Sequence, residues 1–447
     1  MLSKVASFAL SGLDGVPVTA ETDINNGLPS YELVGLPDAA VKESRERVRS
    51  ALKNSGRKFP LSKITVNLAP ADVKKEGSAY DLAIAVGILK ATEQLKADLN
   101  GVVFLGELAL DGALRPASGI LPLLISAKAA GYKKFVIPEG NAAEAAYIEG
   151  IEVYAAASLS EVIDHLSGLK PLSPVPVRAY ESGAKGEYKF DMAYVKGQAT
   201  AKRALEVAVS GGHNILLVGP PGTGKTMLAR CIPGIMPDMT FEEALEVTKI
   251  HSVAGILGAG GIVNVRPFRS PHHTATTVSM CGGGTRTVKP GEISLAHHGV
   301  LFLDEMPEYH RSALEALRQP LEDGVITVTR SGGAVTFPAN FMLCASMNPC
   351  PCGNYGSADR VCTCTPAAIR KYRSRVSGPL LDRIDIQVEV DSVKYDDLAG
   401  DAQEESSAQV KKRVERARAI QRERFRTSEN NSDMGERELK KFCALSK

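Results

Sequence analysis

A glycine-rich run of eight residues follows a short apolar segment, and its residue types suit the binding of phosphate. The apolar segment, residues 215–218, is typical of a buried parallel strand. Glycines let the backbone turn tightly, so successive N–H groups and the start of the next helix can point at phosphate oxygens. The lysine can reach the β- and γ-phosphates, and the threonine after it can ligate Mg²⁺. The run is Gly219, Pro220, Pro221, Gly222, Thr223, Gly224, Lys225 and Thr226.

Two carboxylates end a second apolar segment, residues 299–305. Asp304 suits the holding of Mg²⁺, largely through water, and Glu305 suits the polarising of an attacking water. A third apolar segment ends at Asn348, which we expect to contact the γ-phosphate or that water. By itself, an asparagine beside a proline is more typical of a turn. Together the three segments predict an ATPase that uses Mg²⁺.

Composition limits the classes of protein to which the chain can belong. Its 447 residues suggest two or three domains, and its hydrophobic (44%) and charged (23%) contents are ordinary for globular proteins. A net charge of +2 means that any contact with DNA must come from local basic patches. The sequence has no apolar stretch near the ~18 residues that a membrane span needs. The apolar patch at the N-terminus is too short for a signal peptide. We therefore predict a cytoplasmic protein without a membrane partner.

A proline-rich stretch, residues 171–177, is typical of a semi-rigid spacer and divides the chain. Upstream we predict strands at 64–68 and 135–138 and helices at 42–55 and 81–90, and downstream the alternating strands and helices of a doubly wound parallel sheet. The fold class is α/β. The predicted segments are a first domain at 1–170, a linker at 171–188, a nucleotide-binding domain at 189–395 and a partial helical lid at 396–447.

Several longer strings are distinctive. They are VKGQATAKRALEVAVSGGHNILLVGPPGTGKTMLAR, FRSPHHTAT, PGEISLAHHGVLFLDE, LRQPLEDG, MNPCPCG and SGPLLDRIDI. With them the chain resembles the magnesium-chelatase-like branch of the AAA+ ATPases, and within it the family called YifB or ComM. The strings VGLPDAAVKESRERVRSAL and GELALDGALRPASGILPLLISAKAAG resemble that family's Lon-protease-like domain, whose fold is like domain 2 of ribosomal protein S5.

The resemblance implies a homo-oligomeric ring ATPase, a hexamer, whose better-known relatives act on branched DNA in recombination during natural transformation. It also places Gly197 and Gln198 in the segment that wraps the adenine. The alternative for these two residues is a plain turn at a helix entry. A chelatase-like protein remodeller is the second function consistent with the motifs.

The segment 377–385 resembles the part of the family that carries an arginine finger, and Arg383 is the matching residue. In a ring, such an arginine reaches the nucleotide of the neighbouring subunit. The alternative is a salt bridge with Asp382 or Asp385 in the same chain. Three upstream arginines are further candidates for a finger or for DNA contacts, namely Arg370, Arg373 and Arg375.

Four of the eight cysteines form a C-x-C…C-x-C group: Cys350, Cys352, Cys362 and Cys364. Two close pairs of thiolates can form a tetrahedral Zn²⁺ site, and a bound metal would stabilise the long loop between them. Buried or free thiols and redox-active thiols are the alternatives. Structural disulfides do not fit a reducing cytosol. We expect His272 and His273 to be loop residues rather than metal ligands.

A long segment, residues 266–291, is expected to be a cationic loop that grips a DNA backbone, or else an ordinary solvated loop. Its cations are Arg266, Arg269, Arg286 and Lys289. A predicted hairpin at 325–338 is a second candidate. The first domain offers a third basic face, made of Arg45, Arg47, Arg49, Lys53, Arg57 and Lys58.

The Lon-like strings raise the question of an ATP-dependent protease, which needs a serine nucleophile and a lysine base. Aligned on Gly77, the nucleophile position holds Ala79, and the lysine position holds Leu121. Ser78 and Lys74 lie nearby, but a shift of one residue turns a helical side chain by about 100°. Protease activity is therefore disfavoured.

The end of the chain departs from the family pattern. Members of the family continue with an arginine-bearing helix that has no match here, so we expect a C-terminally short chain. The arginines of the charged helix at 406–424, Arg413, Arg416 and Arg418, have a spacing typical of a solvated face. We also expect poor cover over Phe442, Cys443 and Leu445.

Overall fold

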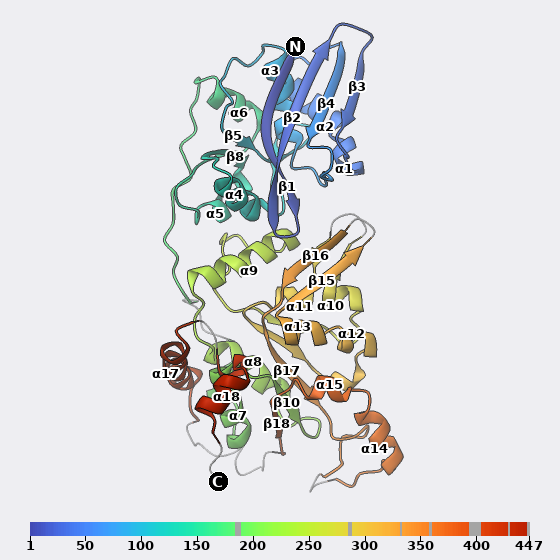
Figure 1. The fold of residues 1–447 in the computed structure, drawn as a ribbon, viewed down its shortest axis with the longest axis vertical. Coiled ribbons are helices and arrows are strands. Elements are labelled where there is room, and N and C mark those ends of the chain that lie inside the picture. Colours follow the sequence, from blue (N-terminus) through green and yellow to red (C-terminus); the bar gives the residue numbers. More distant parts are fainter. Residues whose placement is uncertain are drawn as a thin grey trace. The chain divides into compact units, whose positions relative to one another are not determined.

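The computed structural model describes residues 1–183, 189–284, 288–330, 333–356, 360–392, 404–427 and 430–444. They form two compact units, each described by itself (Figure 1). Unit 1 comprises Met1–Glu181, Ala244–Val263 and Gly284–Lys289, and unit 2 comprises Ser182–Glu243, Asn264–Gly283 and Pro290–Lys447. Two short pieces of the predicted nucleotide-binding domain thus belong to unit 1. The four-segment division of the chain stays a prediction.

Unit 1 is built on a mixed sheet of seven strands in the order β3-β4-β2-β1-β5-β8-β9. Strands β1 and β2 form a long antiparallel hairpin. Strands β5, β8 and β9 run parallel to one another, an arrangement that needs a crossover connection between successive strands. The strands are β1 (Leu2–Ser11), β2 (Asp14–Asn25), β3 (Ser30–Val34), β4 (Lys63–Ala69), β5 (Val102–Phe104), β8 (Lys134–Pro138) and β9 (Glu152–Ala156), with a small pair, β6 (Glu107–Leu108) and β7 (Leu114–Arg115). The strands predicted at 64–68 and 135–138 are confirmed as β4 and β8.

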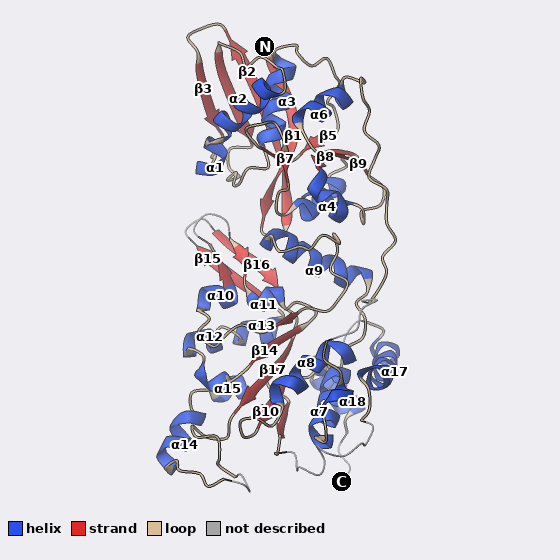
Figure 2. Cartoon of the chain, turned by 180° about the vertical axis from the view of Figure 1, so that it is seen from behind, coloured by secondary structure: helices blue, strands red, loops and turns tan. Residues whose placement is uncertain are grey.

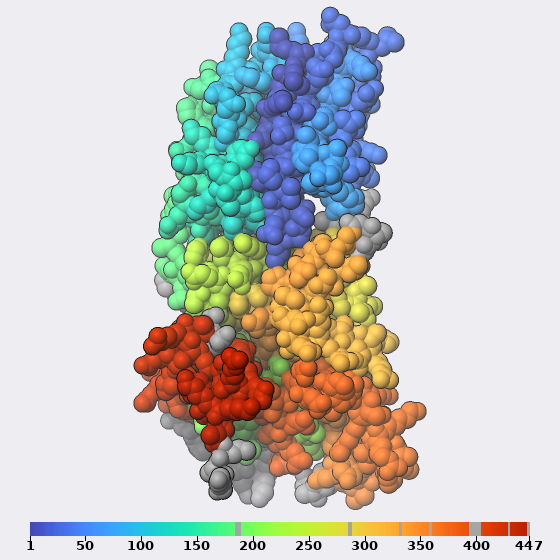
Figure 3. All heavy atoms as spheres, viewed as in Figure 1, coloured from blue at the N-terminus to red at the C-terminus, as the bar shows by residue number. Residues whose placement is uncertain are grey.

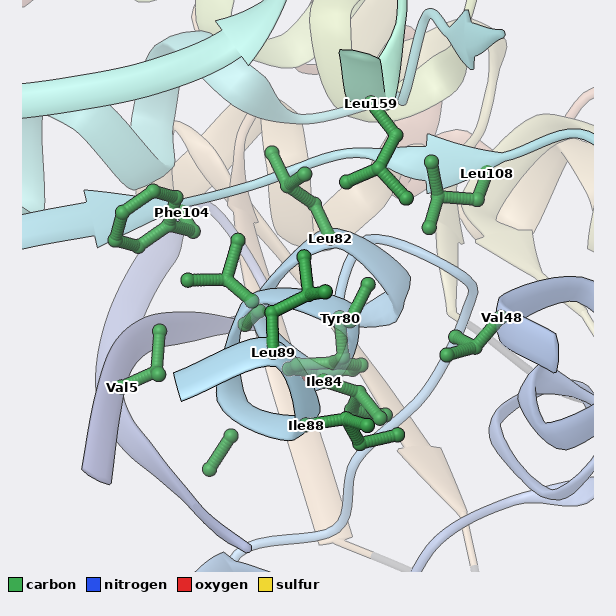
Figure 4. Close-up of a cluster of buried hydrophobic side chains, with 14 of the residues drawn as sticks. Val5, Val48, Tyr80, Leu82, Ile84, Ile88, Leu89, Phe104, Leu108 and Leu159 are labelled. Atoms are coloured by element: carbon green, nitrogen blue, oxygen red, sulfur yellow. The ribbon is translucent and has the colours of Figure 1, made fainter. Parts of the chain in front are cut away.

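Helix α3 (Asp81–Ala91) forms the centre of the unit 1 core, and every residue in it except Lys90 is buried. Its Leu82, Ile84, Ile88 and Leu89 pack among side chains of β1 and β5 (Figure 4). Each such leucine or isoleucine contributes roughly 1.5–3 kcal/mol on burial. The helix predicted at 81–90 is confirmed, but the one predicted at 42–55 is divided at Glu43. The other helices are α1 (Ala39–Lys42), α2 (Ser44–Asn54), α4 (Ile120–Ala129), α5 (Ala142–Ala145), α6 (Leu159–Leu166) and the 3₁₀ turn η1 (Glu139–Asn141).

The proline-rich stretch packs along the edge of this sheet. The Val175 N–H donates to the carbonyl of Val153 at 2.8 Å, and Pro174 forms a bridge with Tyr154. Residues 174–175 of the predicted spacer are thus fixed to β9, an edge strand whose outer hydrogen-bonding groups are available for pairing. Residues 184–188 of the predicted linker lie outside the described residues.

Unit 2 contains a parallel sheet of five strands in the order β11-β14-β17-β10-β18, flanked by helices (Figure 2). The strands are β11 (Phe268–Arg269), β14 (Val300–Leu303), β17 (Met342–Met347), β10 (Ile215–Val218) and β18 (Ile386–Glu389). All residues of β14 and β17 are buried, as expected for continuous apolar runs in a parallel sheet. This order confirms the predicted doubly wound α/β class.

The helices of unit 2 include α7 and α8, which pack on each other and on α17. They are α7 (Ala199–Gly211), α8 (Lys225–Ile235), α10 (Thr277–Cys281), α11 (Glu292–Leu295), α12 (Arg311–Glu315), α13 (Arg318–Asp323), α14 (Pro366–Arg373), α15 (Gly378–Leu381), α17 (Ser407–Phe425) and α18 (Glu436–Phe442), with the 3₁₀ turns η2 (Met192–Tyr194), η3 (Met306–Glu308) and η4 (Asn431–Asp433). Helix α9 (Phe241–Ala254) begins in unit 2, and its residues from Ala244 on belong to unit 1. No helix of the described part of the chain is long and apolar enough to cross a membrane.

The segment 266–291 is not one long loop. It contains β11, α10, β12 (Gly282–Gly283) and β13 (Lys289–Pro290), and Arg286 lies outside the described residues. The hairpin predicted at 325–338 is confirmed as antiparallel β15 (Val325–Arg330) and β16 (Gly333–Pro338).

Helix α17 begins at a capping box formed by Ser406 and Gln409 and buries Val410 and Val414. Figure 3 shows α17 and α18, in red, at the surface of unit 2. Phe442 is 38% exposed and Cys443 is exposed, as expected, and Leu445 lies outside the described residues. The expectation of a solvated face is wrong for Arg418, whose Nη2 donates to the carbonyl of Val209 at 2.8 Å. Burial lowers the pKa of Arg418 to about 10.

Candidate nucleotide-binding site

The phosphate-binding loop connects β10 to α8, as its sequence predicts. Gly222 and Gly224 have φ values of +82° and +86°, a backbone region that favours glycine. A Cβ on Gly219 would lie 2.1 Å from the carbonyl oxygen of Val390, so the loop packs closely against the end of β18. The chain therefore needs glycine at these three positions.

Lys225 lies buried inside this loop. Its Nζ donates to the carbonyl oxygens of Gly219 and Pro220, both at 2.7 Å, and lies 3.4 Å from Oδ1 of Asn348. Burial lowers the pKa of Lys225, while the charges of Asp304 and Glu305 act in the opposite direction. The cation of the first predicted motif and the amide of the third are thus brought together.

Thr226 and Asp304, the two predicted Mg²⁺ residues, are direct neighbours. The Thr226 hydroxyl donates to Oδ2 of Asp304 at 2.8 Å, and the Ser346 hydroxyl donates to Oδ1 of the same carboxylate. Because β14 and β17 are adjacent parallel strands, their carboxyl ends meet at one edge of the sheet. Sequence reasoning missed Ser346, although its place two residues before Asn348 on the same strand was a signal.

Glu305 adopts a left-handed backbone conformation, with φ of +53°, directly after the bend that follows β14. Its N–H donates to the Ser346 hydroxyl at 3.2 Å, and its side chain is 55% exposed. Nδ1 of His273 lies 4.0 Å from the Glu305 carboxylate, and the rings of His272 and His273 lie 4.1 Å apart. His273 is a loop residue, as expected, but no sequence signal placed it beside Glu305.

Gln198 reaches the phosphate-binding loop, and Gly197 does not. Nε2 of Gln198 donates to the carbonyl oxygens of Thr223 at 3.2 Å and Asp391 at 2.6 Å. The Gly197 N–H instead donates to Glu404 at 2.8 Å. A pocket of about 370 Å³ adjoins the loop. It is lined by Tyr194, Val195, Lys196, Gln198, Pro220, Pro221, Gly222, Thr223, Gly224, Met227, Asn354, Arg360 and Ser392.

Arg383 lies at the opposite end of β10 from the phosphate-binding loop. Its carbonyl accepts a hydrogen bond of 2.9 Å from the side chain of Asn214, the residue before β10. Its guanidinium is 42% exposed and lies 3.2 Å from the carboxylate of Glu322. The intramolecular partner is thus neither Asp382 nor Asp385, and Asp385 contacts His213 instead.

Two of the other candidate arginines are held within unit 2. Nη1 of Arg375 donates to Glu308 at 2.7 Å, and Nε of Arg373 donates to the carbonyl of Pro349 at 3.3 Å. Arg370 lies on α14 with an exposed side chain.

Comparison with known proteins identifies the family. Family models that describe subunit ChlI of magnesium chelatase match residues 191–398 and 20–141, and a model of the C-terminal part of ChlI matches residues 404–447. The chain is 43% identical to competence protein ComM of Haemophilus influenzae over 449 residues, which cover 99% of this chain and 87% of that protein. The chain belongs to the YifB/ComM family of magnesium-chelatase-like AAA+ ATPases.

Two further relatives agree with this assignment. Protein YifB of Escherichia coli (strain K12) is 45% identical over 448 residues, covering 99% of this chain and 86% of that protein. Lon protease 2 of Bacillus subtilis is 32% identical over 172 residues, covering 36% of this chain and 31% of that protein. The predicted fold class is confirmed, and family membership supports ATP hydrolysis with ATP and Mg²⁺ as ligands.

In the Lon-like part of this YifB/ComM chain, the two positions that would hold a protease's serine and lysine do not form a protease centre. Leu121, at the lysine position, is 1% exposed, and Ala79 stands at the nucleophile position. The nearby Ser78 hydroxyl donates to Glu107, and Lys74 pairs with Glu76 at 2.6 Å. Ser78 is thus hydrogen-bonded to a carboxylate rather than to a lysine.

The four clustered cysteines converge in space. Their sulfur atoms all lie within 4.8 Å of one another, and Sγ of Cys350 lies 3.4 Å from that of Cys352 and 3.7 Å from that of Cys362. The set, completed by Cys364, supplies four sulfur ligands, the number that a structural Zn²⁺ site uses. The geometry fits zinc, although the spacing within each pair is C-x-C.

We expect purified protein to carry about one zinc ion per chain, measured by elemental analysis. Cys362→Ser should lose most of this zinc, because a structural site needs all four ligands. Cys443→Ser, which changes an exposed cysteine outside the cluster, should keep it. Protein prepared without a chelator and found free of zinc would contradict the assignment.

Proposed function

We propose that this chain is the subunit of an ATP-driven ring motor that acts on DNA. The observation that carries the proposal is the position of Arg383, at the far end of β10 from its own phosphate-binding loop. An exposed arginine so placed serves the nucleotide of a neighbouring subunit, which is how ring ATPases complete their sites. Such a head-to-tail contact gives a closed ring when its rotation closes, and the family resemblance favours a ring of six.

The roles of the site residues follow from their contacts. With nucleotide bound, the Lys225 ammonium would exchange its loop carbonyls for phosphate oxygens, and Thr226 and Asp304 would hold Mg²⁺, which neutralises phosphate charge. Glu305, the exposed carboxylate at the same edge, polarises the attacking water, and Asn348 contacts the γ-phosphate or that water. Gln198, whose Nε2 donates to Thr223 of the loop, would lie beside the adenine, as the family resemblance implies, and Gly197, with φ of +62°, shapes the turn before α7.

DNA as the partner is supported by the name of the Haemophilus relative, a competence protein, since competence is the uptake of DNA by cells. We propose branched-DNA remodelling or branch migration in recombination as the motor's task. A cytoplasmic location suits this task and agrees with the eight free cysteines.

We propose a DNA surface other than the segment 266–291. The Arg266 guanidinium is 11% exposed and contacts Glu243 and the carbonyls of Pro237 and His298. Arg269 forms a bidentate ion pair with Glu292. These two arginines are held by their own unit, so we no longer assign DNA binding to them. In the basic face of unit 1, Arg47 is likewise paired with Asp81. Arg45, Arg49, Lys53 and Lys58 remain exposed there.

We predict that replacing Arg45, Arg49 and Lys53 of α2 together by alanine weakens DNA binding and flattens its salt dependence. Each lost phosphate contact lowers the slope of log K against log salt by about 0.9 for duplex DNA. The matched control removes three exposed lysines elsewhere on unit 1, Lys128, Lys133 and Lys134. Equal effects of both triple variants would indicate only nonspecific charge, and an unchanged slope would leave the β15–β16 hairpin as the candidate.

The proposed function is tested by the ATPase rate measured without DNA, with linear duplex and with four-way DNA. We expect stimulation by four-way DNA above that by linear duplex. Stimulation by unfolded protein substrates but not by DNA would favour the chelatase-like remodeller. Peptide hydrolysis dependent on ATP would favour a protease instead.

A further inference from the structure

We propose that the described residues of the cysteine loop, 350–356 and 360–364, are a metal-held wall of the nucleotide pocket, and that Arg360 is a second nucleotide-binding cation whose position depends on the bound metal. The inference rests on the proposed ATP site and extends it. It concerns nucleotide binding alone, so it does not depend on the action on DNA.

The loop lies directly against the phosphate-binding loop. Gly353, with φ of +81°, approaches Pro221 so closely that a Cβ there would lie 2.6 Å from Cδ of the proline. Asn354 and Arg360 line the same pocket of about 370 Å³ as Pro220–Gly224. A segment without the P-loop motif, more than a hundred residues farther along the chain, thus contributes part of the pocket wall.

Arg360 has the chemistry that this position needs. Its side chain is exposed, it lines the pocket, and a guanidinium forms charge-assisted, often paired hydrogen bonds with phosphate oxygens. Lys225 is buried in the loop, whereas Arg360 approaches from the pocket side. The nucleotide's polyphosphate would therefore meet two cations from different elements.

The sulfur cluster fixes this wall. Between Cys352 and Cys362 the chain makes no helix or strand among its described residues, and residues 357–359 lie outside them. Within the described residues, the sulfur cluster holds this segment, and Tyr355 adds two contacts. Its N–H donates to Sγ of Cys350 at 3.3 Å, and the Arg373 guanidinium lies 5.4 Å from the centre of its ring. A loop anchored at both ends by a shared metal loses its conformation when the metal is removed.

The test is a cycle of two changes, scored by the Kd of a fluorescent ATP analogue on the purified full chain without DNA. The first change is Arg360→Ala and the second is removal of zinc by a chelator, with reloading as a check of reversibility. In zinc-loaded protein, Arg360→Ala should raise Kd about 10-fold, the loss of one charge-assisted contact. Removal of zinc from the unchanged chain should raise Kd by a similar factor.

The decisive result is the non-additivity of the two changes. If metal acts through Arg360, stripping zinc from Arg360→Ala protein should produce little further change. A full additional loss in that variant, or an unchanged Kd for zinc-loaded Arg360→Ala, would overturn the proposal.

Lys371→Ala, which removes an exposed cation on α14 outside the pocket, is the control for net charge. Circular dichroism of each sample excludes unfolding, and Arg360→Lys should recover part of the affinity if charge is what matters.

Failure of this inference is distinguishable from failure of the proposed function. If Lys225→Ala abolishes nucleotide binding while Arg360→Ala leaves it intact, the ATP site stands and the assignment of Arg360 falls. If neither variant alters binding, the ATP site itself is wrong.

Discussion

Glu305→Gln protein is expected to bind ATP with nearly normal affinity and to hydrolyse it at least about 100-fold more slowly. General-base catalysis contributes about 10²–10⁴-fold, and an amide cannot accept the proton of the attacking water. The backbone contact between Glu305 and Ser346 does not involve the side chain that is changed, so the site should keep its geometry. The measurements are single-turnover hydrolysis and equilibrium binding of ATP.

Two variants control this experiment. Lys225→Ala should abolish binding itself, because the phosphates lose a buried cation. Glu308→Gln changes a carboxylate three residues away that pairs with Arg375, and it should retain most of the activity. Near-normal turnover by Glu305→Gln would remove Glu305 from the proposed mechanism and leave His273 and Asn348 to be tested as the groups that position the water.

Arg383→Ala is expected to bind ATP and yet to inhibit wild-type subunits when the two are mixed. An arginine finger is worth about 10³–10⁵ in kcat, so each altered subunit silences the site of its neighbour. Activity should therefore fall more steeply than the fraction of altered subunits. The measurement is the ATPase rate over a series of mixing ratios after subunit exchange.

Glu322→Gln is the matched control, because it removes the intramolecular partner of Arg383 and keeps the arginine. If the salt bridge is what matters, both variants should lower activity alike and strictly in proportion to their fraction. If Arg383 acts across the interface, Glu322→Gln should remain active, since an exposed pair contributes at most about 1 kcal/mol.

The contiguous motifs of the site were predictable from sequence, and the contacts between distant residues were not. A strand, a glycine-rich loop and a helix start leave their signals in neighbouring residues, so the roles of Lys225, Asp304 and Asn348 were predicted from their places in the three motifs. The approach of His273 to Glu305 depends on how the chain returns to the site after thirty residues. No local pattern encodes it.

Charged residues were the most difficult to interpret. Arg266 and Arg418 belong to segments rich in cations, which in sequence are typical of a solvated or DNA-binding surface. In the structure both are half-buried and donate to backbone carbonyls, because a long arginine side chain can reach back to carbonyls of its own unit. The residue type shows that a position is charged, but the spacing of such residues does not show which groups each side chain contacts in the fold.

Strand β10 is only four residues long, and the side chain of Asn214 at its start holds both the Arg383 carbonyl and the Leu343 N–H of the neighbouring strand. If Arg383 serves the adjacent subunit, one short, buried strand connects two features. At its end lies the phosphate-binding loop of its own subunit, and near its start lies the arginine that serves the next subunit. That strand is hydrogen-bonded on both sides, to β17 and to β18, which favours its moving as one piece. A displacement of the loop on cleavage of ATP would then move the arginine that serves the neighbouring site. The subunits of the ring would hydrolyse ATP in sequence rather than independently.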